Sequence, residues 1–194
     1  MRDELPRAIR SMDGFSRPWF VAGGWALDLF LGHASRLHAD IEVALFREDQ
    51  YELRRHLTDW EFEKVAGGER TSWAADEWLP APVHEIHGRQ AQETELELEF
   101  LLNERRGDEW VYRRNPAIRR SLDEIGGRAF GMPFLRPEIV LLYKAKSPRA
   151  VDEQDLDAVI GSLDAKSRAW LAAALAACHP GHRWLDILAG RKPY

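Results

Sequence analysis

The sequence predicts an α+β (α/β) fold: a small, mixed, twisted sheet flanked by helices and followed by a helical C-terminal portion. Short apolar or alternating runs, typical of strands, lie between segments of helical periodicity in the first two thirds of the chain. A connector rich in glycine and proline follows at 126–137, and apolar residues then recur at helical spacing. We therefore expect a sheet domain at 1–134 and a helical portion at 135–194 packed on it.

The first helix and strand lead to a pair of glycines. Apolar residues at helical spacing predict a packing helix from Glu4 to Met12. The apolar run Trp19–Ala22 then predicts a strand, which passes through Gly23 and Gly24 into a helix. That helix is apolar on more than one face, which indicates that it is buried.

Gly23 and Gly24 have two interpretations. Glycine allows positive φ and lets the backbone approach a phosphate, and the amides and dipole of a helix N-terminus favour anions. The alternative is an ordinary turn between a strand and a helix. We favour the phosphate role because of the acidic pair that follows. Asp28, within the helix, is attributed to the helix dipole and left out of the site.

An alternating run at 40–45 places two acids, Asp40 and Glu42, two residues apart. Side chains at i and i+2 of a strand share a face, so these carboxylates stand side by side and repel unless a cation lies between them. Mg²⁺ takes carboxylate oxygens and nucleotide phosphates as ligands. The pair therefore predicts a metal and nucleotide site.

Two basic side chains precede the acids. The planar fork of Arg36 suits the oxygens of a triphosphate, although a solvated loop arginine is the alternative. His38 has the chemistry of a ligand or proton carrier, but a structural histidine beside the strand is the favoured interpretation.

The middle of the chain predicts a helix at 48–58, a strand at 60–65, an irregular segment at 67–82 and a strand at 83–87. Trp73 and Trp78 in the irregular segment either stack on a ligand or, as we favour, pin the loop to the core. His84 and His87 do not share a strand face, which argues against a transition-metal site formed by these two.

A second acidic strand is expected at 95–102. Leucines and Phe100 form one face, and Glu95, Glu97 and Glu99 form the other, for which a solvated face is the simplest interpretation. A polar turn at 103–108 and a strand at 109–112 follow. The next segment carries a basic cluster that either holds phosphates or balances the glutamates: Arg113, Arg114, Arg119 and Arg120.

Residues 19–45 also resemble a known signature. G-G-W-A-L-D followed by H-A-D-I-E is similar to the nucleotidyltransferase superfamily (polymerase beta-like), and above all to the aminoglycoside and lincosamide nucleotidyltransferase families and their uncharacterised relatives. The resemblance implies the nucleotidyltransferase fold and a Mg²⁺-dependent enzyme. Such an enzyme would move a nucleoside monophosphate, AMP from ATP, onto a hydroxyl of a small molecule such as an aminoglycoside-like antibiotic. Glu42 departs from the commoner Asp-x-Asp pattern.

The resemblance also assigns residues. It implies that Asp40, Glu42 and a third carboxylate on a neighbouring strand act as metal ligands and catalytic groups, with Gly23, Gly24 and Arg36 binding the nucleotide. Glu99 matches the third carboxylate best because the strand becomes continuously apolar there, and Glu97 is held in reserve.

The run R-P-E-I-V-L-L-Y-K-A-K at 136–146 is similar to relatives that place a lysine near the nucleotide phosphates. Lys144 and Lys146 cannot share a helical face, and Lys144 is our choice. Relatives often carry a lysine before Asp152, where Val151 stands here. Asp164 is expected to cap a packing helix that reaches Cys178, and a short helix at 184–188 closes the chain.

Composition limits the classes of function. Hydrophobic residues at 45% and charged residues at 30% indicate a globular protein. No apolar run approaches the roughly 20 residues of a membrane span, and the N-terminal residues lack the apolar centre of a secretion signal, so a cytoplasmic location is expected. The single cysteine excludes an internal disulfide framework.

The net charge of -5 argues against general nucleic-acid binding and favours a cationic small molecule. The expected partners are an NTP and a small-molecule hydroxyl acceptor, with no membrane, and the protein is either a monomer or a homodimer. The rival hypothesis is a non-catalytic nucleotide-binding or protein-interaction module of the same fold, which the departure at Glu42 favours.

Overall fold

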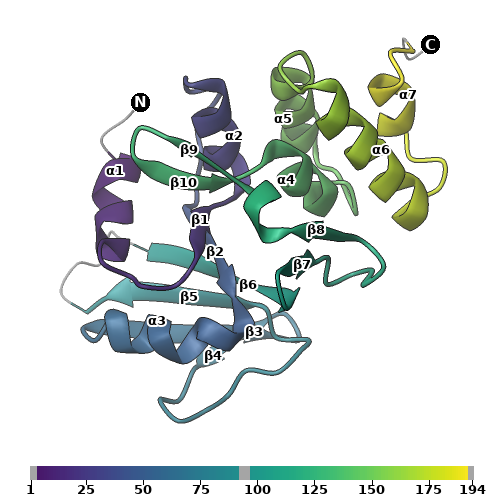
Figure 1. Ribbon diagram of the computed structural model, residues 1–194. Coiled ribbons are helices and arrows are strands. Elements are labelled where there is room, and N and C mark those ends of the chain that lie inside the picture. Colours follow the sequence, from purple (N-terminus) through teal and green to yellow (C-terminus); the bar gives the residue numbers. More distant parts are fainter. Residues whose placement is uncertain (1–3, 92–96, 192–194) are drawn as a thin grey trace.

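The computed structural model describes residues 4–91 and 97–191. Their arrangement is the α+β architecture that the sequence predicts, a mixed sheet flanked by helices (Figure 1). The expected solvated position of Glu95 lies outside the described residues. None of the described helices has the length and apolarity that crossing a membrane requires.

The strands form a twisted mixed sheet whose central members carry the acidic residues. Its order is β4 (Glu69–Ser72), β3 (Trp60–Ala66), β5 (Glu85–Gln90), β6 (Glu97–Arg106), β2 (Glu42–Phe46), β1 (Trp19–Val21), β10 (Met132–Leu135) and β9 (Gly126–Ala129). β2 runs parallel to β6 and antiparallel to β1, and β1 runs parallel to β10. The short strands β7 (Glu109–Val111) and β8 (Arg119–Ser121) extend from the far part of β6.

Helices surround this sheet in two groups. α1 (Glu4–Ile9), extended by a 3-10 turn to Met12, and α3 (Gln50–His56) lie with the sheet in the lower part of Figure 1. α2 (Gly23–Leu31) packs on α4 (Pro137–Lys144) and α5 (Ala150–Ile160). α6 (Ala165–Cys178) packs on α4 and on α7 (Trp184–Leu188). From Pro137 onward the regular structure of the described chain is helical.

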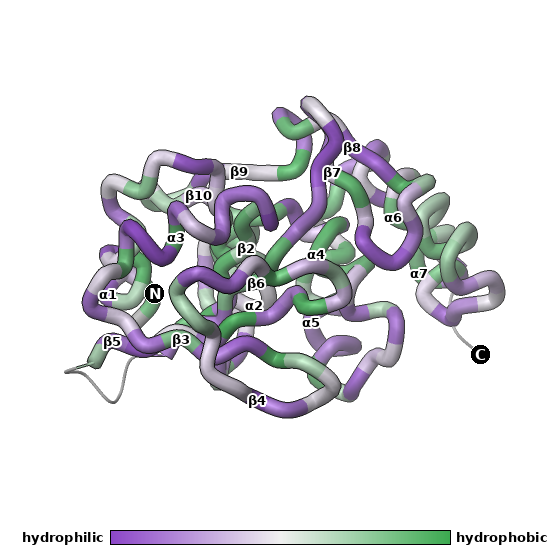
Figure 2. The backbone as a smooth tube through the Cα atoms, turned by 90° about the horizontal axis from the view of Figure 1, so that it is seen from below, coloured by the Kyte–Doolittle hydropathy of each residue, from purple (hydrophilic) through white to green (hydrophobic). Residues whose placement is uncertain are grey.

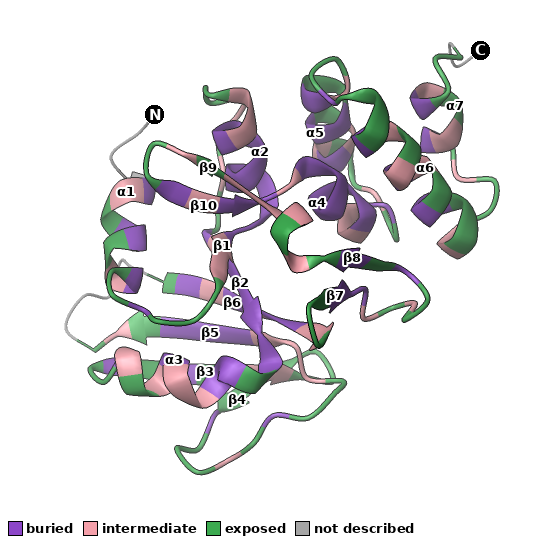
Figure 3. Cartoon of the chain, in the orientation of Figure 1, coloured by how far each residue is buried: buried purple, intermediate pink, exposed green. Residues whose placement is uncertain are grey.

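The core lies between the sheet and the helices on both sides of it, because buried residues of α1 and α3 join the same cluster as those of α2 and α4. Residues along β2, α2 and α4 are largely buried (Figure 3), whereas β6 buries mainly one face. Hydrophobic stretches follow β2 and β6, while β4 is mostly hydrophilic (Figure 2). Beyond Glu42, both faces of β2 are covered, because Ala44 and Phe46 are as buried as Val43 and Leu45. The acids therefore do not share a long open face of β2. They lie only at its beginning.

The expected connector at 126–137 is wrong, because this segment forms the hairpin of β9 and β10. β10 is an inner strand and pairs Phe134 with Val21 of β1. The glycines that suggested a connector lie beneath aromatic rings. A Cβ on Gly126 would come within 2.4 Å of the Phe20 ring, and one on Gly127 within 2.5 Å of the Phe134 ring. Glycine in a strand often marks such close approaches.

Other predicted boundaries also shift. β4 lies within the segment expected to be irregular, and β6 continues through the expected turn to Arg106. Trp73 is buried against Phe62 and confirms the packing role favoured for it, whereas Trp78 is exposed and contacts Tyr51. Asp164 caps α6 by accepting a hydrogen bond of 2.7 Å from the Ser167 amide, as predicted.

Candidate active site

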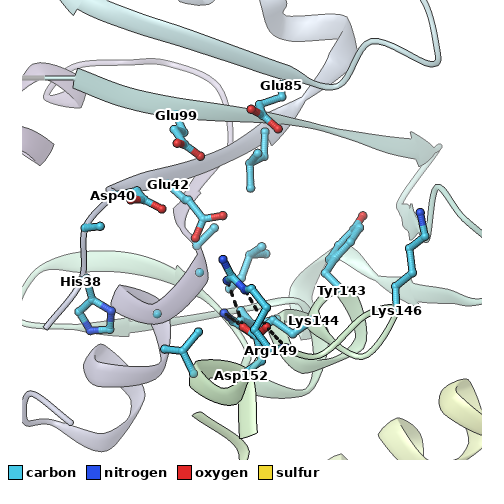
Figure 4. Close-up of a pocket in the computed structure, with 18 of the residues that line it drawn as sticks. His38, Asp40, Glu42, Glu85, Glu99, Tyr143, Lys144, Lys146, Arg149 and Asp152 are labelled. Carbon is cyan, nitrogen blue, oxygen red and sulfur yellow. Dashed lines mark hydrogen bonds and ion pairs between the residues drawn. The ribbon is translucent and has the colours of Figure 1, made fainter. Parts of the chain in front are cut away.

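A cavity of about 680 Å³ lies between the beginning of β2, the neighbouring strands β5 and β6, the N-terminus of α2, and the segment from α4 to α5. Figure 4 shows its charged lining, with carboxylates on the sheet side and basic side chains on the side of the C-terminal helices. The predicted residues Gly23, Gly24, Arg36, Asp40, Glu42, Glu99 and Lys144 all line this cavity.

The three predicted acids gather on one wall of the cavity (Figure 4). Glu42 is the first residue of β2, and Glu99 is its partner in the parallel pairing of β2 with β6. Asp40 lies two residues before Glu42 and outside the strand. The loop before β2, rather than the strand itself, therefore holds the Asp40 side chain.

Two of these acids have no direct partner among the described residues, whereas Glu99 lies 3.9 Å from Nδ1 of His87. Within the described part of the chain, the carboxylates of Asp40 and Glu42 form no hydrogen bond or ion pair. Burial raises the pKa of Glu42, against the opposing charge of Lys144 and with a further contribution from Asp40. Burial likewise raises the pKa of Glu99 to about 7, opposed by His87 and reinforced by the charge of Glu42. Oxygen ligands with excess negative charge fit a hard divalent cation.

A second group of possible ligands adjoins Glu99. The ligand atoms of Glu85, His87 and Glu99 all lie within 4.8 Å of one another. His87 is buried, and its Nε2 lies 2.9 Å from Glu85 while its Nδ1 lies 2.8 Å from Glu97. Glu97, the reserve candidate, is thus engaged with His87. His87 was not predicted to lie in the site, although Glu85 and His87 stand at i and i+2 and therefore share a strand face, which His84 and His87 do not.

The glycine pair makes room for side chains of the protein itself. Gly23 has φ +56°, and a Cβ there would lie 1.4 Å from Oε2 of Glu42. A Cβ on Gly24 would lie 2.2 Å from Nδ1 of His38 and 2.7 Å from Nη2 of Arg36. α2 begins at Gly23, so the Glu42 carboxylate sits at a helix N-terminus, where the dipole favours negative charge. The phosphate role of the two glycines stays a prediction.

Asp28, left out of the site on sequence grounds, holds the loop that carries Asp40. Its buried carboxylate accepts hydrogen bonds from the Ser35 amide at 2.9 Å, from the Ser35 hydroxyl at 2.5 Å and from Nε2 of His38 at 2.6 Å. The His38 ring also lies 4.7 Å from the Trp25 ring. These contacts fit the structural interpretation favoured for His38.

The two basic residues predicted to bind phosphate are both paired with acids of α5. Arg36 donates to Asp155 through Nε at 2.7 Å and Nη2 at 3.0 Å. The Lys144 ammonium lies 2.8 Å from Asp152 and 3.0 Å from Asp155. Asp155 therefore joins the loop before β2 to α4. The nucleotide-binding role of Arg36 and Lys144 remains a prediction.

Arg149 is a basic residue of the cavity that the sequence analysis missed. A hydrogen bond to Asp152 raises the pKa of Arg149, and the charges of Asp40 and Glu42 act in the same direction. In Figure 4 its guanidinium points from the C-terminal side toward Glu42. Arg149 stands three positions before Asp152 in the sequence, and this basic residue was the signal that could have identified it. The resemblance concerned position 151, where relatives often carry a lysine and this chain has Val151.

Comparisons with solved structures identify the fold. The crystal structure of ANT(2'')-Ia in complex with adenylyl-2''-tobramycin has a TM-score of 0.60 and 15% identity over 89% of this chain and 95% of that chain. The lincosamide antibiotic adenylyltransferase LnuA, bound to lincomycin, has a TM-score of 0.56 and 15% identity over 82% and 96%. An antigenic nucleotidyltransferase-like protein from Paracoccidioides brasiliensis has a TM-score of 0.53 and 15% identity over 98% and 94%.

Sequence comparisons identify the family. No curated protein sequence matches the chain. The family model described as aminoglycoside-2''-adenylyltransferase matches residues 4–107, which is more than half of the 194 residues. The chain therefore belongs to the aminoglycoside-2''-adenylyltransferase family of nucleotidyltransferases, which confirms the resemblance seen in its glycine and acid motifs.

Proposed function

We propose that this protein is a Mg²⁺-dependent adenylyltransferase that moves AMP from ATP onto a hydroxyl of a small molecule. One observation carries the proposal. The carboxylates of Asp40 and Glu42 have no partner in the described residues, and they lie with Glu99 beside the N-terminus of a helix in a cavity lined by basic side chains. A nucleotidyltransferase needs this combination of metal ligands and phosphate-binding groups.

Asp40, Glu42 and Glu99 are the residues proposed to hold the cation. Their oxygen donors, the lack of a direct partner for Asp40 and Glu42 among the described residues, and the raised pKa values of Glu42 and Glu99 fit Mg²⁺. When bound, Mg²⁺ neutralises charge on the phosphates and favours displacement at the α-phosphorus.

The remaining residues are assigned by position. The backbone amides at Gly23 and Gly24 would face the pyrophosphate end of ATP, and Arg36, Lys144 and Arg149 would contact phosphate oxygens. The acceptor oxygen forms a bond to the α-phosphorus while the bond to the bridging oxygen of the β-phosphate breaks. Pyrophosphate then leaves, and the acceptor proton passes to a carboxylate, for which Glu99 is the proposed base.

The neighbouring structures suggest the first acceptors to test. The ANT(2'')-Ia structure contains an adenylylated tobramycin, and the LnuA structure contains lincomycin. The fold of this protein is shared with both, so an aminoglycoside-like antibiotic is the acceptor class that the family suggests.

Release of pyrophosphate from ATP, measured with Mg²⁺ and a panel of hydroxyl acceptors, tests the proposal. Asp40→Asn should lower turnover by at least about a hundredfold, comparable to the loss of one preorganised electrostatic group. Asp157→Asn, a change at an exposed acid of α5, is the matched control and should leave turnover unchanged. Binding of ATP and Mg²⁺ without pyrophosphate release from any acceptor would instead support the non-catalytic module.

A further inference from the structure

The basic cluster of the sequence divides into two pairs in the structure. Arg119 lies 3.3 Å from Glu109, and Arg120 lies 2.5 Å from the buried Glu138, so both have acidic partners. Arg113 and Arg114 instead line the active-site cavity, together with Lys146. Within residues 4–91 and 97–191, no ion pair joins Arg113, Arg114 or Lys146 to a carboxylate. We call these three residues the basic wall.

The basic wall surrounds Tyr143. The guanidinium of Arg113 lies 5.5 Å from the centre of the Tyr143 ring, and that of Arg114 lies 5.4 Å from it. Arg114 also donates a hydrogen bond of 2.7 Å to the Tyr143 carbonyl oxygen. Lys146 follows on the same segment, and Figure 4 shows it on the Tyr143 side of the cavity, away from Asp40. The tyrosine ring thus holds the basic groups at one end of the cavity.

The positive charge of the basic wall contributes to the pKa shifts of Arg113 and His84. Burial lowers the pKa of Arg113, and the charge of Arg114 acts in the same direction. Burial also lowers the pKa of His84 on the adjoining strand segment, and the charges of Arg113 and Arg114 add to that effect. Arginine keeps its charge in proteins, so Arg113 and Arg114 bring positive charge to this end of the cavity without an ion-pair partner among the described residues.

The basic wall lies away from the α2 end of the cavity, where the pyrophosphate end of ATP is proposed to bind. Gly23, Gly24 and Arg36 lie at the α2 end of the cavity, and Lys144 is paired with α5. In transfer at the α-phosphorus, the leaving pyrophosphate and the entering hydroxyl lie roughly in line on opposite sides of the phosphorus. If pyrophosphate lies at the α2 end, the acceptor lies toward the basic wall.

Given the transferase activity proposed above, we propose that the acceptor carries an anionic group, a carboxylate or a phosphate, which Arg113, Arg114 and Lys146 bind. Guanidinium groups match the planar or tetrahedral oxygens of such groups, and their charge would repel a polyamine placed against the same wall. The local charge of the pocket thus selects against cationic acceptors, the class that both the net charge of the chain and the family description favour, and the following experiment decides between the two classes.

Four sugars of similar shape and different charge test this inference: glucose, glucosamine, glucuronate and glucose 6-phosphate. Their binding is measured by titration calorimetry with Mg²⁺ and a non-hydrolysable ATP analogue, so that the nucleotide site is already filled. Glucuronate, glucose 6-phosphate or both should bind at least about tenfold more tightly than glucose and glucosamine. Which of the two binds more tightly identifies carboxylate or phosphate as the preferred group.

Two single substitutions and a matched control locate the effect. Arg113→Gln and Lys146→Gln should each remove most of the preference for the anionic sugar while leaving the affinity for the ATP analogue within about twofold. Arg119→Gln, in the same basic cluster but paired with Glu109, should leave the preference intact. Melting temperatures confirm that each variant is folded, and the exposed Lys146 provides a change with little effect on packing.

The outcomes separate this inference from the proposed function. Equal or absent binding of the four sugars, or tighter binding of glucosamine, would overturn the anionic acceptor. A loss of affinity for the ATP analogue in Arg113→Gln would assign the basic wall to the nucleotide instead and would also overturn it. Anion binding that depends on Arg113 and Lys146, without pyrophosphate release from any acceptor, would support the basic wall and contradict the transferase.

Discussion

Gly23 illustrates how one residue without a side chain sets the geometry of the site. Its φ of +56° is left-handed, and a Cβ would overlap the Glu42 carboxylate. Gly23→Ala should therefore displace Glu42 and lower turnover by about a hundredfold, a loss that a misplacement of about 1 Å can produce. Steady-state kinetics of pyrophosphate release measure this effect.

Gly32→Ala is the control for backbone strain alone. Gly32 ends the same helix with φ +77°, and nothing lies within 4 Å of the position of its Cβ. The alanine should lower the free energy of unfolding by about 1 kcal/mol and leave turnover unchanged. Equal turnover in the two variants would show that the contact of Gly23 with Glu42 is unimportant.

At the residue scale, the sequence predicted those site candidates that local spacing brings together. Asp40 and Glu42 are two residues apart, and the pairing of Glu99 with Glu42 agrees with the expectation that the third acid lies on a neighbouring strand. The approach of Arg149 to the acids depends on how α5 packs, and the meeting of His87 with Glu99 depends on the register of β5 and β6. Neither relation is encoded in local spacing.

Among the elements, α5 is joined to the loop before β2 through one buried carboxylate. Asp155 binds both Arg36 and Lys144, so Asp155→Asn removes the main partner of Arg36 and one of the two acidic partners of Lys144. The free energy of unfolding should fall by about 3 kcal/mol, the loss typical of a broken buried ion pair. The KM for ATP should rise as well, because both side chains lose their orientation. Urea unfolding and kinetics measure the two effects.

The exposed Asp157 on the same helix is the matched position. Asp157→Asn makes the same chemical change without removing a buried partner, so its effect should stay within about 0.5 kcal/mol. Similar losses at the two positions would mean that the pairing with Arg36 and Lys144 does not stabilise the fold.

The β9–β10 hairpin shows why some elements escaped prediction. Glycine and proline normally indicate turns, and the segment 126–137 is rich in both. Here Gly126 and Gly127 lie in a strand that pairs with β10, and Phe20 and Phe134 occupy the space that a side chain at either position would need. Phe20 lies more than a hundred positions earlier in the chain, so only the tertiary packing explains the strand. The helices, whose periodicity is local, were predicted with small shifts at their ends.

For the whole molecule, the acids Asp40, Glu42 and Glu99 lower the free energy of unfolding when they are ionised and no metal is bound. The pKa of Glu99 is about 7, above its ordinary value of 4.5. A raised pKa contributes stability below pH 4.5 that is lost as the pH rises through 7, because ionisation is easier in the unfolded chain. Between pH 5 and pH 8 the free energy of unfolding should fall by up to about 3 kcal/mol from this group.

Addition of Mg²⁺ should reverse this loss at pH 8 and have little effect at pH 5, because the cation binds the ionised carboxylates. Glu99→Gln should flatten the pH dependence. Thermal unfolding at the two pH values, with and without Mg²⁺, measures both effects. Because the lowered pKa values of His84 and His182 raise stability over the same pH range, the comparison with Glu99→Gln is decisive. The same pH dependence in Glu99→Gln and in the wild type without Mg²⁺ would contradict the role given to Glu99.

The charge of the whole chain is a poor guide to the charge of its cavity. A net charge of -5 favours a cationic partner, yet Arg113, Arg114 and Lys146 line the pocket without acidic partners in the described residues. The alternatives left open for the basic cluster were phosphate binding and balance of the glutamates. The structure separates them, because Arg119 and Arg120 pair with glutamates and the other two arginines do not.

The location of the cation is tested most directly by Mn²⁺, a paramagnetic ion that accepts the same oxygen ligands as Mg²⁺. Its binding is followed by electron paramagnetic resonance in the wild type, Glu42→Gln and Glu85→Gln. A site formed by Asp40, Glu42 and Glu99 predicts at least about tenfold weaker binding in Glu42→Gln and a change of less than about twofold in Glu85→Gln. The reverse pattern would place the cation at Glu85, His87 and Glu99 and would contradict the account.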